Sequence, residues 1–193
     1  MFQNYSILLE IILNEIIPVT KKALLKGNKI FGAAILRKSD LSTICIGTNN
    51  EVLNPLYHGE ISTIHNFFKK KINENPKDCL FLTTHEPCSL CLSAITWSGF
   101  DNFYYFFPFK ETKDKFNIPH DLSILKEIFN INGGNYNKIN KYWTSFSILD
   151  EIKKLSKSDQ ILLDNQIQEI YRNYSNLSNQ YQLVKENNNI PLN

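Results

Sequence analysis

The chain has 193 residues, of which 42% are hydrophobic, and its formal net charge is +2 at pH 7. This length and composition fit one globular domain with a sizeable core, and they exclude a largely disordered chain. A charge so close to zero gives no general electrostatic argument for a nucleic-acid partner. The first residues lack a basic region, and charged and amide residues interrupt the apolar stretch over 7–19. We therefore expect no signal peptide, no membrane span and a cytoplasmic location.

Apolar residues recur along the chain in two patterns. Spacings of three and four predict helices, whereas short apolar runs between turn residues predict strands. In chain order, the predicted elements are a helix over 5–26, strands over 31–36 and 42–47, a polar loop over 48–57, a helix over 58–67, a break over 73–77, a strand over 79–83, a helix over 88–97, a strand over 101–107 and a helix over 121–129. Pro18 predicts a kink or a break inside the first helix.

Beyond residue 130 the pattern is less clear. Residues 142–149 fit either a strand or the start of a helix, residues 158–185 predict a polar-rich helix, and the end over 186–193 is expected to fray. The alternation of helices and strands before this region predicts an α/β fold with three layers, helices on both faces of a mixed central sheet of about five strands. We assign residues 1–130 to this domain and residues 131–193 to a C-terminal extension packed on it.

Two short motifs, each at the start of a predicted helix, carry side chains that bind metals. They are His58-Gly59-Glu60 and Pro87-Cys88-Ser89-Leu90-Cys91. Cys88 and Cys91 are three residues apart, so both sulfurs share one face of a helix, and the helix N-terminus favours thiolates. With His58 they supply the three protein ligands of a catalytic zinc site, which keeps one position for water. We therefore predict that His58, Cys88 and Cys91 bind Zn²⁺.

Glu60 is the predicted catalytic residue. It follows His58 by two residues, so the two side chains start within one helical turn. A carboxylate in that position can take a proton from a water activated by zinc and pass it to a nitrogen of the substrate.

The alternative is a structural zinc site, which needs a fourth ligand. The cysteines and histidines available for it are Cys45, Cys79, His65 and His85. We expect the first two to be buried free thiols, because both lie in predicted strands or apolar runs.

These motifs resemble those of the cytidine deaminase-like superfamily, in which His-x-Glu precedes Pro-Cys-x-x-Cys. The resemblance covers roughly residues 31–109 and weakens toward residue 129. His58-Gly59-Glu60-Ile61-Ser62-Thr63 is similar to the motif of fungal cytosine deaminases, where Gly replaces the more usual Ala. The second motif, over 84–95, looks more like bacterial guanine deaminases and tRNA adenosine deaminases. The resemblance implies the cytidine deaminase-like fold and a zinc-dependent hydrolase acting on the C–N bond of a cyclic amidine, and it leaves the substrate open.

The same resemblance implies contacts with the substrate. Asn49 stands in the place of an asparagine that contacts the substrate ring, although it also fits a simple turn residue. Asp121 lies in a stretch similar to one that supplies a substrate-contacting carboxylate in bacterial guanine deaminases, and it also fits the N-cap of its helix. Trp143 fits either a wall of the pocket or the core, and we expect the aromatic run over 103–109 to be mostly core.

We expect a deaminase of a small-molecule nucleobase or nucleoside, with guanine or cytosine as the first candidates. One alternative is a tRNA adenosine deaminase, but few lysines or arginines cluster near the motifs to hold an RNA. A second alternative is a deaminase of a pterin or another heterocycle. A third is a zinc-binding module without catalysis, but such a module would have little reason to keep the acid Glu60 beside His58. Related folds build their pockets from neighbouring subunits, so the resemblance also implies a homodimer.

Overall fold

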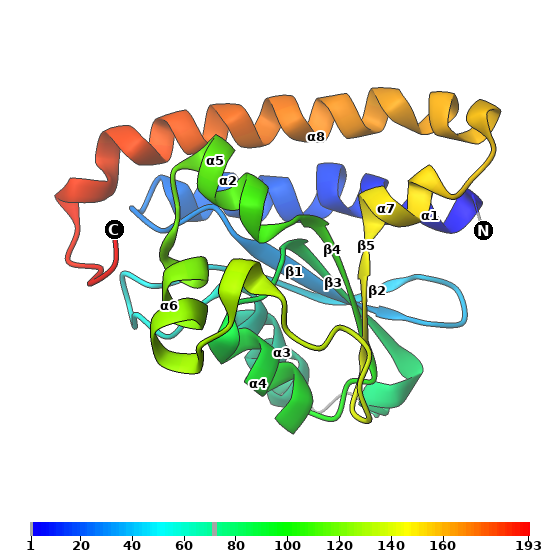
Figure 1. The fold of residues 1–193 in the computed structure, drawn as a ribbon, viewed down its shortest axis with the longest axis horizontal. Helices are drawn as coiled ribbons and strands as arrows, with labels where there is room; N and C mark the ends of the chain where they lie inside the picture. Colours follow the sequence, from blue (N-terminus) through cyan, green and yellow to red (C-terminus); the bar gives the residue numbers. More distant parts are fainter. Residues whose placement is uncertain (1, 71–72) are drawn as a thin grey trace.

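The computed structural model describes residues 2–70 and 73–193. Its centre is a five-stranded sheet in the order β2-β1-β3-β4-β5 (Figure 1). The strands are β1 (Gly32–Arg37), β2 (Thr43–Thr48), β3 (Cys79–His85), β4 (Asn102–Phe107) and β5 (Thr144–Ser147). β1 is antiparallel to β2 and β3, whereas β4 is parallel to β3 and β5. The predicted α/β fold with a mixed central sheet of about five strands is confirmed.

Helices cover both faces of this sheet. They are α1 (Phe2–Ile11), α2 (Ile17–Leu24), α3 (Gly59–Lys69), α4 (Ser89–Trp97), α5 (Phe109–Phe116), α6 (His120–Phe129), α7 (Ile148–Lys153) and α8 (Lys157–Val184). The helices α1, α2 and α8 lie on one face, and α3 and α4 lie on the other (Figure 1). Every helix in the described residues is too short or too polar to span a membrane.

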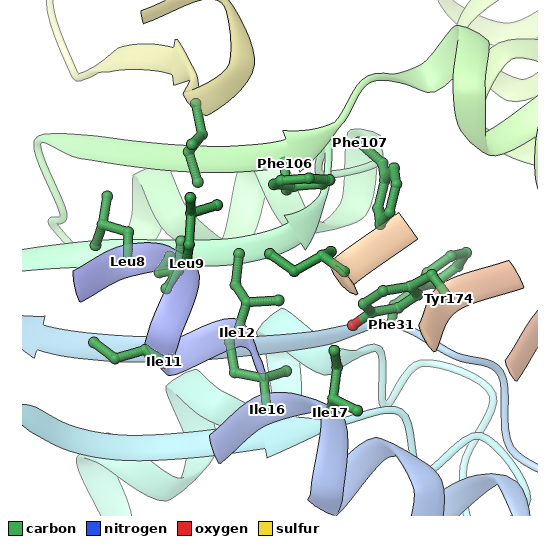
Figure 2. Packing of buried hydrophobic residues seen from close by; sticks show 14 of the residues in the cluster. Leu8, Leu9, Ile11, Ile12, Ile16, Ile17, Phe31, Phe106, Phe107 and Tyr174 are labelled. Atoms are coloured by element: carbon green, nitrogen blue, oxygen red, sulfur yellow. The ribbon is translucent and has the colours of Figure 1, made fainter. Parts of the chain in front are cut away.

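Alternating side chains of the strands divide the apolar core into two layers. In the layer next to α1, α2 and α8, Leu36 of β1 lies in one cluster with Phe106 of β4, and Figure 2 shows Ile12 approaching the sheet there. In the layer next to α3 and α4, Ile35 of β1 lies in one cluster with Phe103 of β4. Because both of their faces are buried, the central strands β1, β3 and β4 are largely apolar in sequence, whereas the edge strand β5 is half-buried and more polar.

The predicted break in the first helix is a local widening of the helix. α1 ends at Ile11, a π-helical turn covers Ile12–Ile16, and α2 begins at Ile17. Pro18 lies in the first turn of α2, where its missing N–H leaves the carbonyl group four residues earlier without an α-helical partner. The π turn absorbs this disruption, and the chain keeps its direction.

Residues 142–149 contain both elements that their pattern allowed. β5 ends at Ser147, whose side chain accepts a hydrogen bond from the backbone N–H of Asp150 and so caps α7. α8 then packs against α1, α2 and α5 and brings the end of the chain back across the molecule. There Ile190 is buried, and Asn193 Oδ1 accepts a hydrogen bond of 2.7 Å from the Tyr181 hydroxyl.

Candidate active site

The candidate ligands lie where two helices begin. His58 is the N-cap residue of α3 and Cys88 is the N-cap residue of α4, both with extended backbone. β3 ends at His85 beside the parallel strand β4, and a short turn leads from it into α4. The site therefore lies outside the carboxyl ends of parallel strands, where α/β sheets commonly bind ligands.

The three predicted ligand atoms converge on one point. His58 Nδ1 lies 3.4 Å from Cys88 Sγ and 3.6 Å from Cys91 Sγ, and the two sulfurs are 3.6 Å apart. A tetrahedral zinc ion with ordinary bond lengths separates two sulfurs by about 3.8 Å and a nitrogen from a sulfur by about 3.6 Å. One imidazole and two thiols at these distances therefore fit Zn²⁺.

The electrostatic environment favours a thiolate at Cys88. The hydrogen-bond contact with Cys91, and then the contact with His58, hold the pKa of Cys88 well below that of an ordinary thiol, against the opposing effect of burial. The thiolate is the form that binds zinc.

Cys45 and Cys79 differ from this pair. As expected, both are buried free cysteines, and they lie in β2 and β3. Burial raises the pKa of each thiol to about 11, so these side chains stay neutral near pH 7.

The carboxyl group of Glu60 lies directly beside the ligands. Its Oε2 accepts a hydrogen bond from Cys91 Sγ at 3.3 Å, and its Oε1 accepts one from the Thr83 hydroxyl at 2.9 Å. Burial, and then the neighbouring Cys88, raises the pKa of Glu60. A raised pKa brings a carboxyl group closer to the range in which it can both take up and release a proton.

Two cavities lie next to these groups. A cavity of about 320 Å³ is lined by His58 and Cys88, by Ile118 and Asp121, and by the end of the chain over 190–192. A second cavity of about 10 Å³, the size of one water molecule, lies among the three ligands, Glu60 and Asp121. A small molecule in the larger cavity can therefore approach the ligands and the carboxyl groups of Glu60 and Asp121.

Asp121 lies in the first turn of α6 and faces both cavities. The interpretation of Asp121 as the N-cap is wrong, because α6 begins one residue earlier than predicted and its N-cap is Pro119. Burial, and then the neighbouring Cys88, raises the pKa of Asp121 well above its ordinary value.

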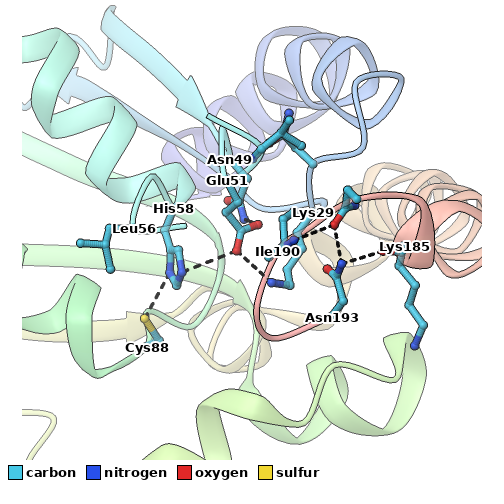
Figure 3. Close-up of polar contacts among 12 residues, drawn as sticks. Lys29, Asn49, Glu51, Leu56, His58, Cys88, Lys185, Ile190 and Asn193 are labelled. Atoms are coloured by element: carbon cyan, nitrogen blue, oxygen red, sulfur yellow. Dashed lines mark hydrogen bonds and ion pairs between the residues drawn. The ribbon is translucent and has the colours of Figure 1, made fainter. Parts of the chain in front are cut away.

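Asn49 lies one layer behind the cavity. Its Oδ1 accepts a hydrogen bond of 2.7 Å from the backbone N–H of Gly59, and its Nδ2 donates one of 2.6 Å to Glu51 Oε2. Asn49 lines a groove on the outer side of the loop over 48–57, whereas Glu51 lines the cavity beside His58 (Figure 3). The structure thus brings Glu60 and Asp121 to the ligands and places Glu51 between Asn49 and the cavity.

Sequence reasoning missed two charged residues of this cavity. Glu51 Oε1 pairs with Lys29 Nζ at 2.8 Å and lies 3.8 Å from His58 Nε2. The two residues are only 3% and 6% exposed. They are 22 positions apart and belong to no motif, so the one available signal was a lysine three residues before the buried strand β1.

Glu86 and Trp143 have structural contacts. Glu86 accepts hydrogen bonds from the backbone N–H of Phe109 and from the Tyr136 hydroxyl, and these tie the turn before α4 to later parts of the chain. Trp143 is buried in the core and donates its Nε1–H to Thr96 Oγ1 at 2.8 Å. Of its two interpretations, the core placement is confirmed.

A family comparison agrees with this geometry. The family described as the cytidine and deoxycytidylate deaminase zinc-binding region matches residues 9–107. The chain belongs to this family. The matched range contains all three candidate ligands and Glu60, so the expected membership of the deaminase superfamily, and zinc as its metal, are confirmed.

Individual relatives are more distant. A guanine deaminase from Bacillus subtilis (strain 168) is 36% identical over 70 residues, which cover 35% of this chain and 44% of that protein, so the match spans less than half the length of that relative. The X-ray structure of guanine deaminase from Bacillus subtilis has a TM-score of 0.51 at 24% identity and covers 66% of this chain and 83% of that chain. A guanine deaminase from Nitrosomonas europaea has a TM-score of 0.50 at 17% identity, covering 79% and 80%. The two structural likenesses establish a shared fold.

Proposed function

We propose that this protein is a zinc-dependent hydrolytic deaminase that releases ammonia from a free nucleobase or nucleoside, with guanine or cytosine as the first candidates. The observation that carries the proposal is the convergence of His58, Cys88 and Cys91, with the carboxyl group of Glu60 in hydrogen-bond contact with Cys91. The donor set fits zinc, and the adjacent carboxyl group fits proton transfer.

In this proposal, zinc bound by the three side chains supplies a water whose pKa is lowered toward ~7. Glu60 takes a proton from the attacking water and delivers it to the ring nitrogen beside the amine. A C–O bond forms at the ring carbon, the C–N bond breaks, and the amine leaves as ammonia after Glu60 has passed on the second proton. The Thr83 hydroxyl, 2.9 Å from Glu60 Oε1, holds the carboxyl group in place.

The choice of a small base rests on two supports. The guanine deaminase of Bacillus subtilis is the relative matched at 36% identity. Asp121 faces the cavity, where its carboxyl group can accept a hydrogen bond from a ring N–H or from the amine. Asn49, which is bonded to Glu51 and Gly59, would position the start of α3, and its direct contact with a substrate stays a prediction.

An assay of ammonia release from a panel of compounds tests the proposal. The panel contains guanine, cytosine, their nucleosides, a pterin and a tRNA anticodon stem-loop, and the purified protein is used with its zinc content measured. We expect release from a free base or nucleoside, and loss of release after zinc is removed with a chelator. Release from the stem-loop alone would replace the proposal with RNA editing, and no release from a protein with about one zinc per chain would overturn it. The homodimer expected from the resemblance is a separate prediction, which sedimentation of the same sample checks.

A further inference from the structure

A buried lysine lines the cavity beside the candidate zinc ligands. The side chain of Lys29 is 7% exposed, and its Nζ pairs with Glu51 Oε1 at 2.8 Å. An ammonium group carries three N–H donors, and within the described residues this pair accounts for one of them. Because unfilled donors of a buried charge are costly, the other donors call for an acceptor inside the cavity.

Lys29 lies on the far side of the metal-binding imidazole. His58 turns Nδ1 toward the two sulfurs and Nε2 toward Glu51, at 3.8 Å from its Oε1, and Glu51 in turn holds Lys29 (Figure 3). One imidazole and one carboxylate therefore separate the ammonium group from the sulfurs. Lys29, His58 and Cys88 line the same cavity, so a ring whose amine-bearing carbon approaches the ligands can direct another edge toward Lys29.

The charge balance of the cavity limits what Lys29 can bind. Among the described residues that line it, Glu51 and Asp121 are carboxyl groups, and Lys29 is the lysine that opposes them. A phosphate would meet the carboxylate of Glu51, which already pairs with the lysine. A neutral acceptor such as a ring carbonyl oxygen gains the hydrogen bond without that repulsion.

We propose that Lys29 is a specificity-determining residue that donates a hydrogen bond to a carbonyl oxygen of the substrate ring. The cavity then selects amino-heterocycles that also carry an oxo group, such as guanine and cytosine, over rings that lack one. This inference rests on the proposed deaminase function and deepens it by naming the substrate class.

Two matched pairs of compounds test the inference. Guanine and 2-aminopurine differ by the oxo group, as do cytosine and 4-aminopyrimidine. We expect the wild-type protein to prefer the oxo member by kcat/KM, and the Lys29→Met variant to lose about tenfold to a hundredfold of that preference, mainly through a higher KM for the oxo member. Calorimetric binding of the oxo products xanthine and uracil should weaken by a similar factor.

Control variants separate recognition from folding. Lys22→Met removes a lysine of the outer groove and should keep the wild-type preference. Lys29→Met leaves the Glu51 carboxylate buried without its partner, so the paired variant Lys29→Met/Glu51→Gln, which removes both charges, is measured as well, with zinc content and melting temperature as checks of folding.

The outcomes separate this inference from the proposed function. Turnover of the oxo bases with the same preference in wild type and in the Lys29 variants overturns the role of Lys29 and leaves the deaminase intact. Equal losses of kcat/KM on both members of each pair would show that Lys29 has a structural role, and they also overturn its role in substrate recognition. If the wild-type protein turns over none of the four compounds, the result contradicts both the proposed deamination of guanine or cytosine and the role of Lys29.

Discussion

Glu60 lies in the first turn of α3, two residues after the N-cap residue His58 and next to Gly59, which starts the helix. Free backbone N–H groups and the helix dipole favour negative charge at this end, as they do for the thiolate of Cys88 at the start of α4. The start of α4 thus favours the thiolate of Cys88, while burial raises the pKa of Glu60 at the start of α3. The site thus places a thiolate that must stay ionised, Cys88, near a carboxyl group that must gain and lose a proton, Glu60.

Replacing Glu60 with glutamine tests this division of roles. Glu60→Gln keeps a side chain of similar shape that can still bond to Thr83, but it cannot take up a proton. We expect kcat to fall by about a hundredfold to ten-thousandfold while the zinc content stays near one per chain. Ammonia release and metal analysis measure the two quantities, and Glu127→Gln, an exposed glutamate of α6, serves as the control. Retained turnover in Glu60→Gln would remove Glu60 from the mechanism.

His85 gives a prediction about pH. Its imidazole lies among aromatic rings, its Nδ1 is 3.0 Å from Thr84 Oγ1, and its Nε2 is buried without a partner in the described residues. Burial lowers the pKa of His85 well below 6.5, so below about pH 6.5 the unfolded chain binds a proton that the folded chain does not. Stability is therefore lost as the pH falls.

We expect the free energy of unfolding of the wild-type protein to drop by about 1.4 kcal/mol more than that of His85→Leu between pH 7.5 and pH 5.5. Urea denaturation at both pH values, with saturating zinc, measures the difference. Any acid effect on the zinc ligands is common to both proteins and cancels in the comparison. Parallel losses in the two proteins would show that His85 does not titrate in this way.

At the scale of elements, the position of α3 against β1 depends on Gly59. A Cβ atom at this position would lie 2.9 Å from both Gly32 Cα and the Phe31 carbonyl oxygen, which is too close for real contacts. The helix start, and with it His58, can approach the sheet only because residue 59 has no side chain. This close approach explains a glycine at a position where the related motif more usually has alanine.

Gly59→Ala should therefore push α3 away from β1. We expect the free energy of unfolding to fall by about 1–3 kcal/mol, as for other overpacked contacts, and zinc affinity to fall as well because His58 moves with the helix. Ser62→Ala in the same helix is the matched control, since it removes only a hydroxyl group. Urea denaturation and competition with a zinc chelator measure the two effects, and wild-type values for both would contradict the close contact.

The elements and the site differ in how far the sequence predicts them. The strands β1 to β4, α3 and α4 follow from apolar patterns, because burial on a defined face imposes a regular period, whereas the sequence left the region of β5 open between a strand and the start of a helix. α5 was missed, since it is short and polar and its first residue, Phe109, continues the aromatic run of β4. His58, Glu60 and the cysteines are local motifs, whereas the pairing of Lys29 with Glu51 depends on the path of the loop over 48–57, which no local pattern encodes.

At the scale of the whole molecule, the candidate site joins segments that are far apart in the chain. The cavity is lined by residues near the start of β1, the loop before α3, the turn before α4, the start of α6 and the last residues after α8. α8 crosses over α1 and α2 to bring this last segment back (Figure 1). A bond that fixes two of these segments to each other should therefore stabilise the fold as a whole.

Zinc is such a bond, because His58 begins α3 whereas Cys88 and Cys91 belong to the start of α4. A ligand present at a thousandfold excess over its Kd stabilises the folded state by about 4 kcal/mol, which corresponds to roughly 10 °C in Tm for a chain of this size. We expect the wild-type protein to melt about 10 °C lower after chelation in scanning calorimetry. Cys88→Ala should melt at the lower temperature with or without added zinc, and Cys45→Ala, which removes a buried thiol that is no ligand, should keep the response to zinc. A wild-type Tm that is the same with zinc and with chelator would mean that the metal does not hold α3 and α4 together.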